Sequence, residues 1–155
     1  MLHSLHHTRF LVSRTPGRTR LINVFLAGPD RFIVDLPGYG YAAGPRGESD
    51  AWQAMIENYL LMRPTLRMVF VLVDAEVGPT ALDLQMLGWL RHVRLPHRIV
   101  AAKADQVKPG RQGARRQDMA AALGLPPDAV AWVSCKKGKG LIELRNEIAA
   151  LLELL

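Results

Sequence analysis

The chain has 155 residues, of which 49% are hydrophobic, and 20 Lys and Arg against 14 Asp and Glu give it a formal charge of +6. This size and composition predict one globular domain, residues 1–155, with a core of ordinary size. The longest apolar run, Met68 to Val73, falls far below the roughly 18 residues of a transmembrane span, and no basic-then-apolar leader opens the chain. We therefore expect a cytoplasmic protein without a membrane or DNA partner, and its charge favours RNA or a nucleotide.

Short apolar runs alternate with longer segments of mixed polarity, which predicts an α/β fold. The apolar character of the runs is typical of buried parallel strands. The first two are separated only by Gly28 to Asp30, which suffices for an antiparallel hairpin, so we expect a sheet that is mixed at one edge. The expected strands are 21–27, 31–35, 67–74, 97–102 and 129–134.

Helices are expected between these strands and after the last one. Thr80 and Asp83 have the spacing of a capping box at the start of one helix. The last helix repeats Leu and Ile at helical spacing, and we expect these side chains, together with the three tryptophans and the single Cys135, to fill the core. The expected helices are 49–62, 80–92, 114–123 and 141–154.

Three expected strands end in polar residues, and ligands of open α/β sheets bind beyond the carboxyl ends of the strands. The first set is Asp35, Leu36, Pro37 and Gly38. In this D-x-x-G spacing a carboxylate can hold Mg²⁺ through water while a glycine amide approaches a terminal phosphate. An ordinary turn also favours Asp, Pro and Gly, so the spacing alone leaves both interpretations open.

The second set is Lys103, Ala104 and Asp105, in which the carboxylate can accept both N–H groups on the edge of guanine while the lysine stem packs beside the base. The third set is Ser134, Cys135 and Lys136, whose backbone N–H groups can face the guanine oxygen. Each set alone is also typical of a solvated loop. Their order along the chain, each after an apolar strand, favours a guanine nucleotide site.

Four longer segments carry a resemblance to a known family: "SRTPGRTRLINVF", "FIVDLPGYGYA", "VLVDAEVGPTALDLQML" and "VSCKKGKGLIEL". In this order they resemble characteristic segments of the EngB (YihA/YsxC) family of ribosome-biogenesis GTPases, of the TRAFAC class, over the chain from about Leu11. The resemblance implies a three-layer, Ras-like P-loop GTPase fold with a mixed, mostly parallel sheet.

The resemblance also implies GTP or GDP and Mg²⁺ as cofactors. Thr19 would be the switch threonine on Mg²⁺, Asp35 would help hold the metal, and Gly38 would lie at the γ-phosphate, Thr19 and Gly38 taking part in hydrolysis. Residues 103–105 and 134–136 would surround the guanine. Tyr39 follows Gly38 where Ras-like enzymes carry a water-positioning Gln, which implies slow hydrolysis awaiting an activating partner. The family role is assembly of the large ribosomal subunit, whose precursor or rRNA would be the partner, and it is linked to cell division and septation.

The chain departs from the family pattern at two places. Ala102 stands where the family usually has Thr, and G-x-x-x-x-G-K-[ST], the loop that cradles phosphates, does not occur. Met1 to Leu5 resembles the interior of the helix after that loop, so the chain resembles a family member without the first strand and phosphate loop, either a fragment or a degenerate homologue. By family analogy that strand pairs with the strands ending at Asp35 and Asp74, so an edge of each would be left unpaired.

A second interpretation is a non-hydrolysing ribosome- or rRNA-binding protein that keeps the fold. Two basic segments expected to be loops, Lys108 to Arg116 and Lys136 to Gly140, could contact RNA phosphates or form a solvated surface. His3, His6 and His7 have no carboxylate or cysteine spaced with them, and we expect no metal there.

Overall fold

The computed structural model describes residues 22–38 and 46–153, with side chains from residue 53 onward in the second range. Its contacts divide the chain into two compact units, one up to Pro64 and one from Thr65. Among the described residues, no helix combines the length and the apolarity that crossing a bilayer requires.

The first unit contains a β-hairpin and a helix. Strands β1 (Asn23–Gly28) and β2 (Arg31–Asp35) pair antiparallel, as the short connection predicts, and Asp30 in that connection has a left-handed φ of 57°. Several apolar side chains of the hairpin are exposed: Leu26 and its cross-strand partner Phe32 are 72% and 54% exposed. Helix α1 (Arg46–Leu61) buries Ile56 and Leu60, which lie one turn apart.

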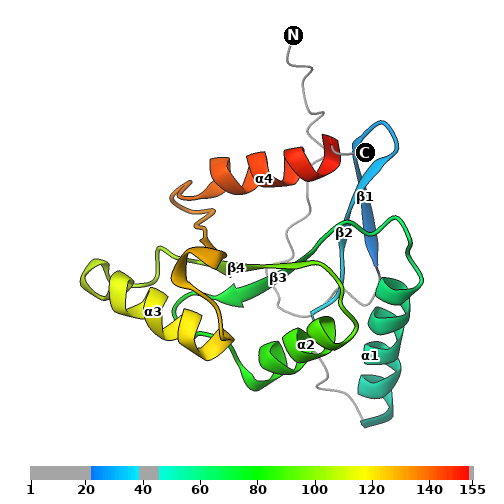
Figure 1. Ribbon diagram of the computed structural model, residues 1–155, viewed down its shortest axis with the longest axis horizontal. Coiled ribbons are helices and arrows are strands. Elements are labelled where there is room, and N and C mark those ends of the chain that lie inside the picture. The colour runs from blue at the N-terminus through cyan, green and yellow to red at the C-terminus, as the bar shows by residue number, and fades with distance from the viewer. Residues whose placement is uncertain (1–21, 39–45, 154–155) are drawn as a thin grey trace. The chain divides into compact units, whose positions relative to one another are not determined.

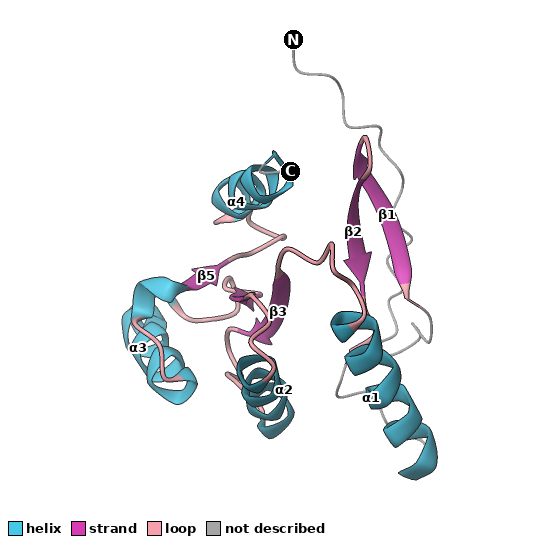
Figure 2. Ribbon diagram, turned by 45° about the vertical axis from the view of Figure 1, so that its right-hand side comes forward, coloured by secondary structure: helices cyan, strands magenta, loops and turns pink. Residues whose placement is uncertain are grey.

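The second unit is a parallel sheet of three strands with helices on both faces (Figures 1 and 2). Its strands are β3 (Val69–Asp74), β4 (His97–Ala102) and β5 (Val130–Trp132), with β4 in the middle. Helices α2 (Ala81–His92) and α3 (Gln112–Leu123) cover one face, and α4 (Leu141–Glu153) lies on the other. Two short 3₁₀ helices, Pro109–Arg111 and Pro127–Ala129, flank α3.

The core of the second unit lies between β3, β4 and the helices α2 and α3. Val71 and Val73 of β3 are buried, whereas Leu72 between them is 63% exposed, as the alternation of a strand requires. β4 is buried over three consecutive residues, which fits a central parallel strand. Other buried side chains of this core are Leu87, Leu90, Met119, Leu123 and Val130.

The predicted capping box is confirmed. The Thr80 hydroxyl accepts from the backbone N–H of Asp83 at 3.2 Å, and the Asp83 carboxylate accepts from the backbone N–H of Thr80 at 2.6 Å. These two bonds satisfy N–H groups that the first turn of α2 would otherwise leave unpaired. The helix therefore begins directly after Thr80, the capping residue that the sequence predicts.

The strands form two sheets: β2 pairs only with β1 and β3 only with β4 among the described strands. Each therefore has one side without a described partner strand. The antiparallel and the parallel pairing are each as predicted, but among the described strands they lie in two separate sheets where the sequence predicts one mixed sheet.

The expected burial of the last helix is wrong. No described residue of α4 is buried, and Ile142 is 70% exposed. The physical reason is that α4 is alone among the described elements of its unit on that face of the sheet (Figure 2), so no second described helix of the unit covers its apolar face. Of the tryptophans, Trp132 is buried as expected and Trp89 is half-buried; the side chain of Trp52 lies outside the described residues.

Candidate functional site

The loop after β4 holds the predicted Lys103, Ala104 and Asp105. The chain turns at Lys103, whose φ of 58° is left-handed, and Ala104 is buried beneath the turn. The N–H of Ala104 donates to the carbonyl of Val133 at 2.9 Å, and the N–H of Val133 donates to the carbonyl of Ala101 at 2.9 Å. These backbone bonds fix the loop to the segment that follows β5.

The second and third predicted sets meet at a hydrogen bond between side chains. The fully buried Ser134 donates its hydroxyl to Oδ1 of Asp105 at 2.5 Å, and the same hydroxyl accepts from the N–H of Lys137 at 3.1 Å. The Ser134 hydrogen bond lowers the pKa of Asp105, with smaller help from Lys136 and Lys137, so Asp105 is a carboxylate at neutral pH. The two segments predicted to surround a guanine therefore share a hydrogen-bonded contact.

The turn from Ser134 to Gly140 is closed by its own backbone. The N–H of Ser134 donates to the carbonyl of Lys139 at 2.9 Å. Gly140 has a φ of 70°, and a Cβ at this position would lie 2.1 Å from the carbonyl oxygen of Trp132, so a side chain does not fit. Cys135 is exposed on this turn, which corrects the expectation that it fills space in the core: a residue that leaves the sheet at a tight turn no longer faces the core.

Asp74 is a polar neighbour of the base loop whose role the sequence-based reasoning missed. Its Oδ2 lies 2.8 Å from Nζ of Lys103, and its Oδ1 accepts from the N–H groups of Glu76 at 2.9 Å and Val77 at 3.0 Å. Burial opposes ionisation of Asp74, but the hydrogen bonds from Lys103 and the two amides outweigh it and lower its pKa. The bond to Asp74 raises the pKa of Lys103. The sequence did carry an indication of this role, because Asp74 ends an apolar strand just as the predicted site residues do.

The predicted phosphate-side residues lie in the first unit. Asp35 ends β2 and is exposed, and its Oδ2 accepts weakly from Nδ2 of Asn23 at 3.4 Å. Leu36 is half-buried, Pro37 is buried and Gly38 is exposed. Thr19 and Tyr39, like the three histidines near the N-terminus, lie outside the described residues. In the part of the chain that the structure describes, no group of three or more His, Cys, Asp or Glu is arranged to hold a metal ion.

The two basic segments lie close to each other. Nζ of Lys139 donates to Oε1 of Gln112 at 3.2 Å, which links the turn after β5 to the start of α3. The segment 108–116 is not the loop that we expected, because it is helical from Pro109 onward, first as a 3₁₀ turn and then as α3. The exposed cations on the two segments are Lys108, Arg111, Lys136, Lys137 and Lys139.

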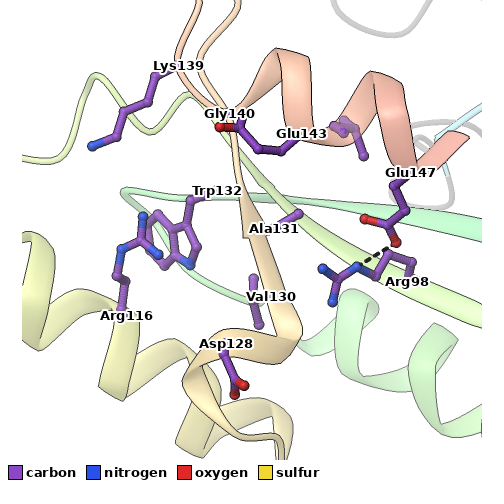
Figure 3. Close-up of a pocket in the computed structure, with 11 residues that line it drawn as sticks. Arg98, Arg116, Asp128, Val130, Ala131, Trp132, Lys139, Gly140, Glu143 and Glu147 are labelled. Carbon is purple, nitrogen blue, oxygen red and sulfur yellow. Dashed lines mark ion pairs between the residues drawn. The ribbon is translucent and has the colours of Figure 1, made fainter.

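A hollow of about 360 Å³ lies beside β5, between α3 and α4 (Figure 3). The Arg116 guanidinium lies over the Trp132 ring, 4.8 Å from its centroid, and Arg98 pairs with Glu147 at 2.9 Å. Arg98 also donates to the carbonyl of Ala129. Because Lys103, Asp105 and Ser134 do not line this hollow, it is distinct from the predicted guanine site.

Comparisons with known proteins show which family the chain resembles. A family model for a 50S ribosome-binding GTPase matches residues 1–103. A "Probable GTP-binding protein EngB" of Clostridium perfringens is 42% identical over 147 residues, which cover 93% of this chain and 75% of that protein. The chain belongs to the EngB family. An EngB protein of Thermotoga maritima is 36% identical over 143 residues, covering 92% of this chain and 73% of that protein.

The fold of the EngB family is also found by structure. A crystal structure of a probable GTP-binding protein EngB matches with a TM-score of 0.73 at 19% identity, covering 88% of this chain and 85% of that one. The predicted fold class, an α/β fold of the P-loop GTPase type, is therefore confirmed. The match to EngB relatives extends over most of the chain, although the sequence contains no G-x-x-x-x-G-K-[ST].

Proposed function

We propose that this EngB-family chain binds guanine nucleotides, GTP and GDP, through Lys103, Ala104 and Asp105 together with Ser134, Cys135 and Lys136. The observation that carries the proposal is the bond of Ser134 to Asp105, which holds an ionised carboxylate at the carboxyl end of the parallel sheet. A fixed carboxylate accepts both N–H groups on the guanine edge, whereas adenine lacks this pair of donors. In the proposed complex the Lys103 stem packs beside the base, and the N–H groups of the 134–136 segment face the guanine oxygen.

For the phosphate side we propose that Asp35 and Thr19 hold Mg²⁺ and that Leu36, Pro37 and Gly38 lie beside the γ-phosphate. The donor set fits the metal, because Mg²⁺ in nucleotide sites keeps several waters and takes only one or two protein carboxylates. Asp35 is exposed at the end of its strand, where its carboxylate can contact water and a metal ion. When bound, Mg²⁺ supplies positive charge that offsets the charge of the phosphates.

Nucleotide binding is the activity proposed for the chain itself. Hydrolysis in the family would add Thr19 and Gly38 as catalytic groups, and this fold also uses the loop G-x-x-x-x-G-K-[ST], which this sequence does not contain. We propose that residues 1–155 act as one EngB-type G domain in the cytoplasm. Release of inorganic phosphate from GTP would measure hydrolysis by the chain.

The proposed partner is a precursor of the large ribosomal subunit, contacted through its rRNA, in a role linked to cell division and septation. The support is the hydrogen bond between Lys139 and Gln112, which brings the basic turn after β5 beside the start of α3, and both segments carry exposed cations. Phosphate backbones bind such clusters with strong salt dependence. The same surface favours the second candidate function, a non-hydrolysing rRNA-binding protein that keeps the fold.

Replacement of Asp105 by Asn tests the guanine site. Fluorescent GDP bound to the chain should be displaced by GDP and not by ADP, and Asp105→Asn should weaken GDP roughly 10- to 100-fold, because a charged acceptor is lost, while admitting xanthine nucleotides. The matched control is Asp118→Asn, the same chemical change on an exposed carboxylate of α3. Unchanged guanine preference in Asp105→Asn, or equal displacement by ADP, contradicts the proposal.

A further inference from the structure

Asp74 connects two loops that leave neighbouring strands. It pairs in register with Ala102 at the ends of β3 and β4, so the next residues of both strands emerge side by side. The N–H of Ala75 donates to the carbonyl of Ala102 at 2.8 Å. One carboxylate oxygen of Asp74 is used within its own loop and the other reaches Lys103 at 2.8 Å. The carboxylate is thus a bridge between the β3 loop and the base loop.

The loop that carries Asp74 is itself held from a third element. Arg115 of α3 donates from Nε to the carbonyl of Ala75 at 3.0 Å and from Nη2 to the carbonyl of Glu76 at 2.6 Å. The N–H of Gly78 donates to the carbonyl of Asp74 at 2.9 Å. Because the Asp74 carboxylate is held by these bonds, it cannot easily move with Lys103. The ion pair therefore fixes the position of Lys103, not that of Asp74.

Lys103 is a residue that needs such support. Its φ of 58° lies in the left-handed region, which side chains other than Gly adopt at a cost and which persists where the surroundings impose it. Its side chain is 61% exposed, and without a fixed partner the long stem would sample many rotamers. The contact with Asp74 restricts both the stem and the turn in which it begins.

We propose that Asp74 is a positioning residue for the base loop: by holding Nζ of Lys103 from an anchored loop, it sets the geometry of Lys103, Ala104 and Asp105. The effect of Asp74 on nucleotide affinity rests on the proposed guanine site. Its effect on the order of the base loop can be measured in the chain without ligand. Asp74 touches no base in this proposal and acts only through Lys103.

The test compares Asp74→Asn with Asp74→Glu and with Glu76→Gln as the matched control. Asn keeps an oxygen for the two loop amides but loses the charge that faces Lys103, Glu keeps the charge, and Glu76→Gln removes a charge from the exposed neighbour on the same loop. Nitrogen-15 NMR of the ligand-free chain would follow exchange of two amides of the base loop. These are Ala104, bonded to Val133, and Gln106, bonded to Lys103.

In Asp74→Asn we expect both amides to exchange roughly 5- to 10-fold faster while amides of central β4 are unchanged. The pKa of Lys103 should fall back toward its ordinary value, Glu should restore part of both effects, and Glu76→Gln should show neither. Unchanged exchange at Ala104 and Gln106, or a rise shared equally by β4, overturns the positioning role.

A GDP titration separates this inference from the proposed function. If the unmodified chain binds GDP, Asp74→Asn should weaken it several-fold while the preference for guanine over adenine is retained, and equal affinity in the two proteins overturns the role in binding. If the unmodified chain binds no GDP, the proposed function fails, and the exchange data alone decide whether Asp74 positions the loop.

Discussion

At the scale of single residues, the buried hydroxyl of Ser134 lowers the pKa of Asp105 through its hydrogen bond. We expect Ser134→Ala to raise the pKa of Asp105 toward its ordinary value, because the hydrogen bond is the largest cause of the lowered pKa. Proton NMR titration of the Asp105 carboxyl would measure this. Cys135→Ala, at the exposed neighbouring residue, is the matched control and should leave the pKa where it is.

The same hydrogen bond gives a pH dependence with a definite sign. The folded pKa of Asp105 lies below the ordinary aspartate value of 3.8, so the stabilisation is fully present above pH 3.8 and is lost as the pH falls through the folded pKa. The difference in free energy of unfolding between the natural chain and Ser134→Ala should therefore shrink below pH 3.8. A difference that stays constant into acid would show that the stabilisation does not come from an ionised Asp105.

The residues of the base loop were predictable because the spacing of K-A-D and S-C-K after apolar strands is a local pattern. The partner of Lys103 was not predicted, because Asp74 is 29 residues away and becomes a neighbour only through the pairing of β3 with β4. Cys135 was misjudged for a related reason: its exposure follows from where the turn leaves the sheet, which residue type does not reveal.

At the scale of elements, the loop between β3 and α2 depends on Gly78. Its φ is 88°, and a Cβ there would lie 2.5 Å from Nη2 of Arg115, the atom that donates to the Glu76 carbonyl. The Arg115 tip can move aside, so the backbone conformation is the main cost, and Gly78→Ala should lower the free energy of unfolding by about 1–2 kcal/mol. Urea denaturation would measure this loss.

Gly113→Ala serves as the control for that measurement. Gly113 lies in α3, and a Cβ there would meet nothing within 4 Å. Alanine should raise the free energy of unfolding by up to roughly 0.5–1 kcal/mol, because Gly is the poorer helix former. If Gly78→Ala does not lower the free energy of unfolding, or lowers it by less than Gly113→Ala raises it, the left-handed turn at Gly78 is not important for stability.

Within the part of the chain that the structure describes, hydrophobic patterning found the five strands and four α-helices to within a few residues at their ends, because burial requires the period of each element. The capping box fixed the start of α2 because it is a local bond between Thr80 and Asp83. Patterning failed for α4, where Leu and Ile at helical spacing are half-exposed: the period identifies an apolar face, and the packing partner of that face depends on the rest of the fold.

At the scale of the whole molecule, the two sheets differ in how well their backbone bonds are protected. A lone two-stranded hairpin is marginally stable in water, and the apolar side chains Val24, Leu26, Phe32 and Ile33 of β1 and β2 are 46–72% exposed. β4 lies between two strands and its Ile99, Val100 and Ala101 are at most 2% exposed. Hydrogen exchange should therefore be roughly 100-fold slower in β4 than in the hairpin. Similar protection in both would contradict this ranking.

The open edge of β3 bears on handling of the protein at high concentration. A strand edge without a neighbour can recruit another chain, and proteins usually guard such edges with charges, prolines or bulges. Among the described strands β3 is paired on one side only, and its residues before Asp74, VFVLV, carry no charge or proline. Concentrated solutions are therefore expected to lose material to β-rich aggregates seeded along this edge, and the loss should grow with protein concentration.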